Sequence, residues 1–476
     1  MSSEKFRRQL RQESEQWRSE GLIESDLYDR LAERYQFSQL ETEASHRFIA
    51  ILMGLGAILL GLGAITFVAA NWQVWSRSLK MVLLISTFIG VNATGFYLWR
   101  KPMNQPGYQR LGAGLLIMGA LLLGANLGLM SQMFHQSGDL YELFVIWGLG
   151  VALMAYSLRL TVLGAIALIL VMLAYCFSWG SADTWLVFSG TTLVMQHLPL
   201  VVSLIFVPLA YWCRSRVIFG LSGIAIAVSY FFNFHVYQIL NHGWLIALGL
   251  LLPTVTLWAY SDRIWQRWLP LPSRTDENRD DADERRDRFQ PIAQTLALWS
   301  FSILLYVFSF RTWWEFRNSG YQFGEWNTTI LIDAALLGII AVLGWVELRY
   351  ELFSRRSLPK VVNSRSMGGL FLVSAVALIG SPQVAMLPVL VFNGVLFSLA
   401  ILLIWDGLAL TQRSTFWGGM VLLVLGIITR TLEYDTGLLL KAIVLAVCGV
   451  GVITAGLRFE RRLRPGSSLS TPEQHP

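Results

Sequence analysis

Residues 140–178 have the sequence LYELFVIWGLGVALMAYSLRLTVLGAIALILVMLAYCFS. Two apolar runs, 140–158 and 160–178, are separated by a single basic residue, Arg159. A helix needs about 20 apolar residues to cross the roughly 30 Å hydrocarbon core of a bilayer, and each run comes close to that length. The stretch therefore predicts two consecutive transmembrane helices with a very short connection.

Similar apolar runs continue along most of the chain. The other predicted spans are 48–70, 80–99, 111–131, 197–213, 217–234, 243–260, 291–310, 328–347, 367–381, 386–405, 415–430 and 437–457. The runs 367–381 and 415–430 are the shortest, which leaves twelve crossings as the alternative to fourteen. The predicted fold class is an all-α polytopic membrane bundle of 12–14 transmembrane helices with a short cytoplasmic N-terminal helical hairpin.

The composition supports a membrane protein. Of 476 residues, 54% are hydrophobic and only 14% are charged, against about 25% charged in an average globular domain. The mean hydropathy is +0.52. These values exclude a disordered chain and a nucleic-acid-binding domain, and the net charge of +6 needs another explanation. The three cysteines form no CxxC pair, so neither a disulfide framework nor a structural zinc site is expected.

The distribution of Lys and Arg is asymmetric if the N-terminus is cytoplasmic and successive spans cross the membrane in alternating directions. Of 37 Lys and Arg residues, 31 then lie on the cytoplasmic side. The other six are Arg77, Lys80, Arg311, Arg317, Arg430 and Lys441. This asymmetry follows the positive-inside rule and predicts that both termini are cytoplasmic.

Charge also suggests the domain boundaries. Residues 1–46 are predicted to form a cytoplasmic hairpin with its break at Gly21. A membrane bundle of about eight helices is expected over 47–260, and one of about six over 291–458. Between them, 261–290 is rich in charges of both signs and predicts a cytoplasmic linker, while 459–476 is expected to be a disordered cytoplasmic tail.

Part of the chain resembles a known family. The relevant stretches are the pre-membrane segment 16–35, the sequence GLGAITFVAANW at 61–72, and the pair GALLLG at 119–124 and QMFHQSGD at 132–139. Over roughly residues 10–160 the chain resembles the bacterial multi-pass membrane proteins grouped as domain of unknown function 2157. The resemblance implies an integral membrane protein, and the apolar helices favour a bacterial inner or internal membrane over the outer membrane. It implies no reaction.

A polar cluster is predicted at the outer side, between the third and fourth spans. It contains His135, Ser137, Asp139 and Glu142. Asp139 could simply cap the fourth helix, because Asp is favoured there. The sharper alternative is a cation-binding, proton-relaying or pH-responsive surface. His197, His235 and His242 also fall at predicted outer ends, but no HxxxH or HxH spacing supports a metal site, and neither a metal nor a cofactor is expected.

Ionisable residues at membrane depth suggest a second site. Asp333 lies about one turn inside its span, and Arg430 ends another span on the same predicted side. Such residues are costly in a bilayer and generally pair with one another. We therefore expect a buried Asp333–Arg430 ion pair, serving either as a structural lock or as a substrate or proton site.

Aromatic residues and prolines add two further expectations. The outer loop around Trp313, Trp314 and Trp326 is predicted to lie at the lipid–water interface or to bind an apolar partner. Proline can break a helix and free carbonyl groups, which bind ions in some transporters. The prolines at such positions are Pro199, Pro208, Pro253 and Pro388.

Three classes of function remain open. No nucleotide-binding, hydrolase or metalloprotease motif is found, and no catalytic residue is predicted. A non-catalytic assembly, scaffold or envelope-response protein ranks first, because the membrane-depth charges are few and lie near the outer edge. A secondary transporter or permease for a small solute or ion is the alternative, and a membrane-embedded enzyme acting on a lipid-linked substrate ranks third. The expected partners are the lipid bilayer and another membrane protein or a second copy of the chain, not nucleic acid.

Overall fold

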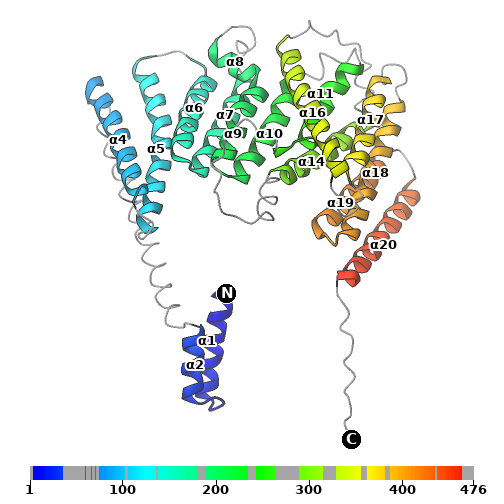
Figure 1. Ribbon diagram of the computed structural model, residues 1–476, viewed down its shortest axis with the longest axis horizontal. Coiled ribbons are helices and arrows are strands. Elements are labelled where there is room, and N and C mark those ends of the chain that lie inside the picture. Colours follow the sequence, from blue (N-terminus) through cyan, green and yellow to red (C-terminus); the bar gives the residue numbers. More distant parts are fainter. Residues whose placement is uncertain are drawn as a thin grey trace. The chain divides into compact units, whose positions relative to one another are not determined.

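The computed structural model describes most of the chain (Figure 1). The described residues are 4–35, 59, 66, 70, 74–101, 106–135, 138–179, 189–233, 243–262, 289–312, 314, 328–354, 362–380, 386–434 and 437–463. Within these ranges the secondary structure is helical throughout, with no strand. The structure divides into one unit over Met1–Thr87 and a second over Phe88–Pro476.

The first unit contains the N-terminal hairpin. Helices α1 (Glu4–Ser19) and α2 (Ser25–Tyr35) pack against each other. The chain reverses at Gly21, whose φ of +71° is in the left-handed region that glycine adopts without strain. The Tyr28 hydroxyl donates to Glu15 Oε1 at 3.3 Å, and the Arg18 guanidinium lies over the Tyr28 ring. Residues 4–35 of the predicted N-terminal segment therefore form a helical hairpin, and residues 36–46 lie outside the described residues.

The apolar helices follow the predicted spans. They are α4 (Arg77–Trp99), α5 (Pro106–Met133), α6 (Leu140–Leu158), α7 (Thr161–Ser178), α8 (Gly190–Gln196), α9 (Leu198–Trp212), α10 (Arg216–Asn233), α11 (Gly243–Trp258), α14 (Gln290–Phe308), α16 (Thr328–Ser354), α17 (Ser364–Gly380), α18 (Met386–Ala409), α19 (Arg413–Glu433) and α20 (Leu438–Leu463). Every predicted span except the first, 48–70, has a helix at its place, and that first span falls almost wholly outside the described residues.

Ten of the described helices are long and apolar enough to cross a membrane, and the bent pair α8–α9 brings the number to eleven. The predicted span 415–430 is longer than the sequence suggested, because α19 has 21 residues. Helices α11 and α17 are shorter apolar helices. The all-α polytopic membrane fold is therefore confirmed.

Many large apolar side chains have no protein around them. Leu438 is 85% exposed and Leu390 is 74% exposed, and none of the apolar window of α20 is buried. Contiguous apolar surface on this scale would be unfavourable in water but is suited to lipid. The exposed faces of these helices are therefore the lipid-facing surface.

Two large hydrophobic clusters hold the second unit together. The first runs from Leu116 on α5 through α6, α7, α9 and α10 to Ala293 on α14. The second is built by α11, α14, α17, α18 and α19, together with Trp314. Helix α11 precedes the charged segment 261–290 but packs against α14, α16 and α17, which follow it. Because α10 and α14 are also in contact, the expected division at 261–290 does not separate two packing units.

Small residues allow one close helix contact near the N-terminal side of this unit. A Cβ atom at Gly124 on α5 would clash with the Trp147 ring of α6. The indole Nε1 of Trp147 donates to the Ala120 carbonyl at 2.7 Å. The small residues Ala120 and Gly124 of α5 thus accommodate a tryptophan from the next helix, and small residues commonly allow such close contacts in membrane bundles.

Candidate functional site

The break between α8 and α9 positions the most unusual polar group of the structure. The two helices meet at His197 with a bend of 86°. Helix α8 begins with a capping box at Ser189 and ends where the His197 amide donates to the Leu193 carbonyl. Helix α9 then starts with Pro199 in its first turn, a position that proline favours because it has no amide hydrogen to offer. The sequence therefore ends one helix and starts the next around a single histidine.

His197 pairs with an acid that lies far away in the sequence. Its Nδ1 atom is 2.6 Å from Oδ1 of Asp333 on α16. The Asp333 side chain is 2% exposed and that of His197 is 17% exposed. Asp333 lies within the apolar window Leu331–Leu348 of α16. An ionisable pair at this depth is energetically costly, and such groups usually mark ion or proton pathways.

A layer of hydrogen bonds connects this break with α7 and α10. The side-chain Nδ2 of Asn233 donates to the backbone carbonyl of Gln196 at 2.8 Å. The Tyr175 hydroxyl donates to Asn233 Oδ1 at 2.7 Å and lies 3.1 Å from the Ser229 carbonyl. Tyr230 packs in one cluster with Ala334 and Leu337, the neighbours of Asp333 on α16. The hydrogen bonds hold the end of α8 against α10, next to the break at His197.

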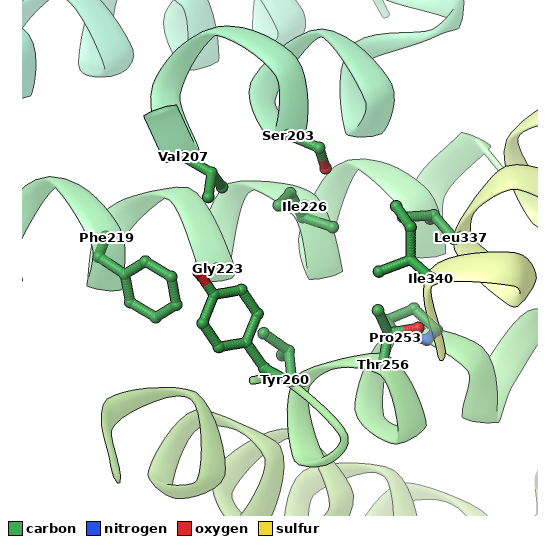
Figure 2. Close-up of a pocket in the computed structure, with 11 residues that line it drawn as sticks. Ser203, Val207, Phe219, Gly223, Ile226, Pro253, Thr256, Tyr260, Leu337 and Ile340 are labelled. Carbon is green, nitrogen blue, oxygen red and sulfur yellow. The ribbon is translucent and has the colours of Figure 1, made fainter. Parts of the chain in front are cut away.

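A cavity of about 50 Å³ lies between α9, α10, α11 and α16 (Figure 2). Leu337 and Ile340 line it from α16, one and two turns after Asp333 on the same helix. Ser203 and Val207 line it from the middle turns of α9. The remaining lining residues are Phe219, Gly223, Ile226, Pro253, Thr256, Leu257 and Tyr260. The cavity therefore lies in the middle of the bundle and begins one helical turn from the acid.

A second polar cluster lies beside the cavity at Tyr260, which is one of the lining residues. The Tyr260 hydroxyl lies 2.6 Å from the Tyr211 hydroxyl, which in turn donates to Asp262 Oδ1. Asp262 Oδ2 accepts the backbone amides of Phe289 and Gln290 at 2.8 and 3.0 Å, where α14 begins. Since Tyr211 is near the end of α9 and His197 at its start, acids lie at both ends of this helix with the cavity between them.

The predicted Asp333–Arg430 pair is wrong. Asp333 binds His197, whereas Arg430 Nη1 forms its ion pair with Glu433 and donates to the Ser309 carbonyl at 2.5 Å. A glutamate one turn along the same helix is the closer partner for Arg430. The sequence placed both charges at the same side of the bundle, but it did not show which helices are neighbours.

The predicted outer cluster is only partly described. Ser137 lies outside the described residues. Asp139 occupies the N-cap position of α6, but its side chain makes no capping hydrogen bond, and His135 is in the left-handed region with φ +51°. Glu142 instead accepts a hydrogen bond from Thr191 on α8 at 3.1 Å. Among the described residues no group of three His, Cys, Asp or Glu is arranged to hold a metal ion.

Trp314 does not belong to an exposed partner surface, contrary to the prediction. It is 4% exposed, donates from Nε1 to the Phe308 carbonyl at 2.9 Å and packs against the Phe392 ring. Its ring fills space between α14 and α18, which explains its burial. Trp313 and Trp326 lie outside the described residues.

Sequence reasoning placed His197 among several outer histidines without connecting it to Asp333. One signal was available, because Pro199 follows His197 closely and indicated a break in a span that ends on the same predicted side as Asp333. The cavity-lining residues and the Tyr211–Tyr260–Asp262 cluster carry no such signal, since isolated serine and tyrosine residues are common in membrane helices.

The fold and the site together define a polytopic integral membrane protein with a buried His–Asp pair at a helix break. The model of the family DUF2157, which is described as 'Predicted membrane protein', matches residues 15–164. This match confirms the resemblance found in the sequence. No curated protein and no solved structure matches the chain. The match ends before His197 and Asp333, so the candidate site lies in the part of the chain beyond it.

Proposed function

We propose that this protein is a secondary transporter or permease for a small solute or ion, in which the His197–Asp333 pair takes up and releases a proton. The observation that carries the proposal is the burial of this pair at the 86° break between α8 and α9. Discontinuous helices form the ion and substrate sites of many secondary transporters. Chains of Asp and His within a membrane are characteristic proton carriers.

The cavity supports the same function. It reaches the middle of α9, it begins about one helical turn from Asp333 at Leu337, and Tyr260 lines it with a hydroxyl group that contacts the Tyr211 hydroxyl. Ser203, Thr256 and Tyr260 provide hydroxyl groups that can hydrogen-bond to water or to a solute. Transport would require this cavity to open first to one side of the membrane and then to the other.

We place the His197 end of α9 outside and the Tyr211 end in the cytoplasm. This orientation rests on the distribution of Lys and Arg along the sequence, which puts both termini in the cytoplasm. The apolar helices favour a bacterial inner or internal membrane over the outer membrane. A proton entering from outside would then reach Asp333 before the cavity.

Cysteine accessibility tests the proposal without knowledge of the solute. Cys176, Cys213 and Cys448 are first replaced by alanine, and Ser203→Cys then places one thiol in the cavity. A membrane-impermeant methanethiosulfonate reagent is applied to right-side-out and to inside-out vesicles. Transport requires that the thiol react from both sides, because the cavity must open to each side of the membrane in turn.

A matched control is Ser222→Cys on α10, because Ser222 is fully buried but does not line the cavity. It should stay unmodified. If Ser203→Cys is as unreactive as Ser222→Cys from both sides, the cavity does not open and the transport proposal fails.

A second function, assembly with a partner, is favoured by the hairpin α1–α2. Leu22 and Leu27 in this hairpin are 69% and 48% exposed, and exposed leucines on a small helical unit can bind a protein. Native mass spectrometry after gentle purification tests this function. A stoichiometric partner or second copy that is lost on deletion of residues 1–35 supports it, and a lone chain in both samples opposes it.

A further inference from the structure

Arg430 is held on three sides near the end of α19. Its Nη1 atom donates to the Ser309 carbonyl at 2.5 Å and pairs with the Glu433 carboxylate. The face of its guanidinium lies 4.1 Å from the centre of the Phe310 ring. The side chains of Arg430 and Glu433 are only 11% and 12% exposed. The position of the guanidinium group is thus fixed by contacts that use one nitrogen and one face.

The other edge of this guanidinium is unused. Arg430 Nε and Nη2 are buried and have no hydrogen-bond partner in the described structure. Asn393 on α18 shows the same deficit, because its Nδ2 donates to the Ser309 and Val389 carbonyls while its Oδ1 is buried without a donor. Leaving a buried donor unsatisfied is energetically unfavourable, and more so for a charged group.

The geometry of the free edge determines what can satisfy it. The Nε–H and Nη2–H bonds of arginine lie in one plane and point the same way, which matches the two oxygens of a carboxylate. Glu433 already contributes one negative charge beside the guanidinium. A second single negative charge is therefore tolerated better than the double charge of a phosphate monoester.

We infer that the free Nε/Nη2 edge of Arg430 is a binding site for the carboxylate group of a ligand, next to Asn393. The Asn393 Oδ1 atom would accept a hydrogen bond from a bound water or from a hydroxyl or ammonium group of the same ligand. This inference is independent of the proposed proton site, because it uses α14, α18 and α19 and not His197 or Asp333. The carboxylate can come from a small soluble acid or from the serine headgroup of a lipid.

The test uses the full chain in nanodiscs of phosphatidylcholine at pH 7. Chloride is replaced stepwise by acetate at constant ionic strength, and the thermal unfolding midpoint is measured. We expect acetate to raise the midpoint in a saturable way. Arg430→Lys keeps the positive charge but removes the two parallel N–H donors of the guanidinium group. The apparent affinity for acetate should therefore fall about tenfold. Arg413→Lys, on the same helix but with a 65% exposed side chain, should leave the response unchanged.

A second set of nanodiscs with added phosphatidylserine distinguishes the sources. Stabilisation by phosphatidylserine but not by acetate, with the same dependence on Arg430, supports a lipid ligand. Asn393→Asp places a fixed carboxylate beside the guanidinium and should abolish either response, which keeps the test usable if Arg430→Lys does not fold. The inference is overturned if neither acetate nor phosphatidylserine stabilises the protein, or if the response is the same in Arg430→Lys and Asn393→Asp as in the parent.

Discussion

His197 Nδ1 lies 2.6 Å from Asp333 Oδ1, although 136 positions separate the two residues in the sequence. The contact joins the break between α8 and α9 to α16, and both side chains are largely removed from solvent. The contact thus connects two parts of the bundle through two ionisable side chains. A change in the protonation of either side chain would alter this contact.

The first prediction concerns the energy of this pair. Asp333→Asn and His197→Phe should each destabilise the detergent-solubilised protein by about 1–3 kcal/mol, because each removes the charge-assisted hydrogen bond between the two side chains. The double variant should lose clearly less than the sum of the two single losses. Unfolding in a titration with sodium dodecyl sulfate measures the free energies, and strictly additive losses would show that the two side chains do not interact.

The second prediction follows from the correction of the Asp333–Arg430 pair. Because these residues have separate partners, Asp333→Asn and Arg430→Gln should be additive within about 0.5 kcal/mol. Arg430→Gln combined with Glu433→Gln should instead be non-additive, since those two residues form an ion pair. Strong coupling between Asp333 and Arg430 in the same titration would show that these two side chains do interact.

The third prediction tests the contact between α11 and α16. A Cβ atom at Gly344 would clash with the backbone carbonyl of Ala259, whereas at Gly338 on the same helix it would meet open space. Gly344→Ala should therefore cost about 1–3 kcal/mol of unfolding free energy. Gly338→Ala should be neutral or slightly stabilising, because alanine favours the helix. Equal effects of the two substitutions would contradict the close approach of α11 and α16.

The fourth prediction concerns pH and the N-terminal hairpin. The hydrogen bond from Arg11 Nε lowers the pKa of Glu15, whose carboxylate also accepts from Tyr28. A lowered pKa means that the stabilisation is present above the ordinary pKa of a glutamate and is lost as the pH falls through the lowered value. Glu15→Gln should accordingly speed amide hydrogen exchange in α1 and α2 at pH 7.

At a pH below the lowered pKa, Glu15 is protonated and should behave like glutamine. After correction for the intrinsic pH dependence of exchange, the full-length protein and its Glu15→Gln variant should then exchange alike in the hairpin. A difference that persists unchanged at low pH would mean that the charge of Glu15 does not stabilise the hairpin.

The sequence alone predicted the fold class and nearly all apolar helices, because hydrophobic length is a strong signal in membrane proteins. It missed α8 as a separate helix, since seven residues are too few to produce such a signal. It also did not show that α11 packs with the helices after the charged segment. Which helices are neighbours depends on side-chain packing, which hydropathy does not encode.

The candidate site could be predicted only in part. Asp333 was recognised because an acid within an apolar span is rare, but its partner was chosen by opposite charge and predicted side. Arginine seemed the natural partner, whereas the structure uses the neighbouring histidine at a proline-marked break. Trp314 was predicted at a surface because aromatic residues often line membrane interfaces, yet tertiary packing buries it.

If the His197–Asp333 pair controls access to the cavity, as we propose, then removing the charge of Asp333 should change the reactivity of a thiol inside the cavity. The reaction rate of Ser203→Cys with an impermeant thiol reagent is compared at pH 7 in the parent and in Asp333→Asn, which imitates the protonated acid. Asp406→Asn serves as control, because Asp406 is another buried acid, 6% exposed, on α18. We predict that Asp333→Asn changes the rate about tenfold, a shift of about 1.4 kcal/mol in the opening equilibrium, while Asp406→Asn does not. Equal rates in the parent and in Asp333→Asn would contradict the claim.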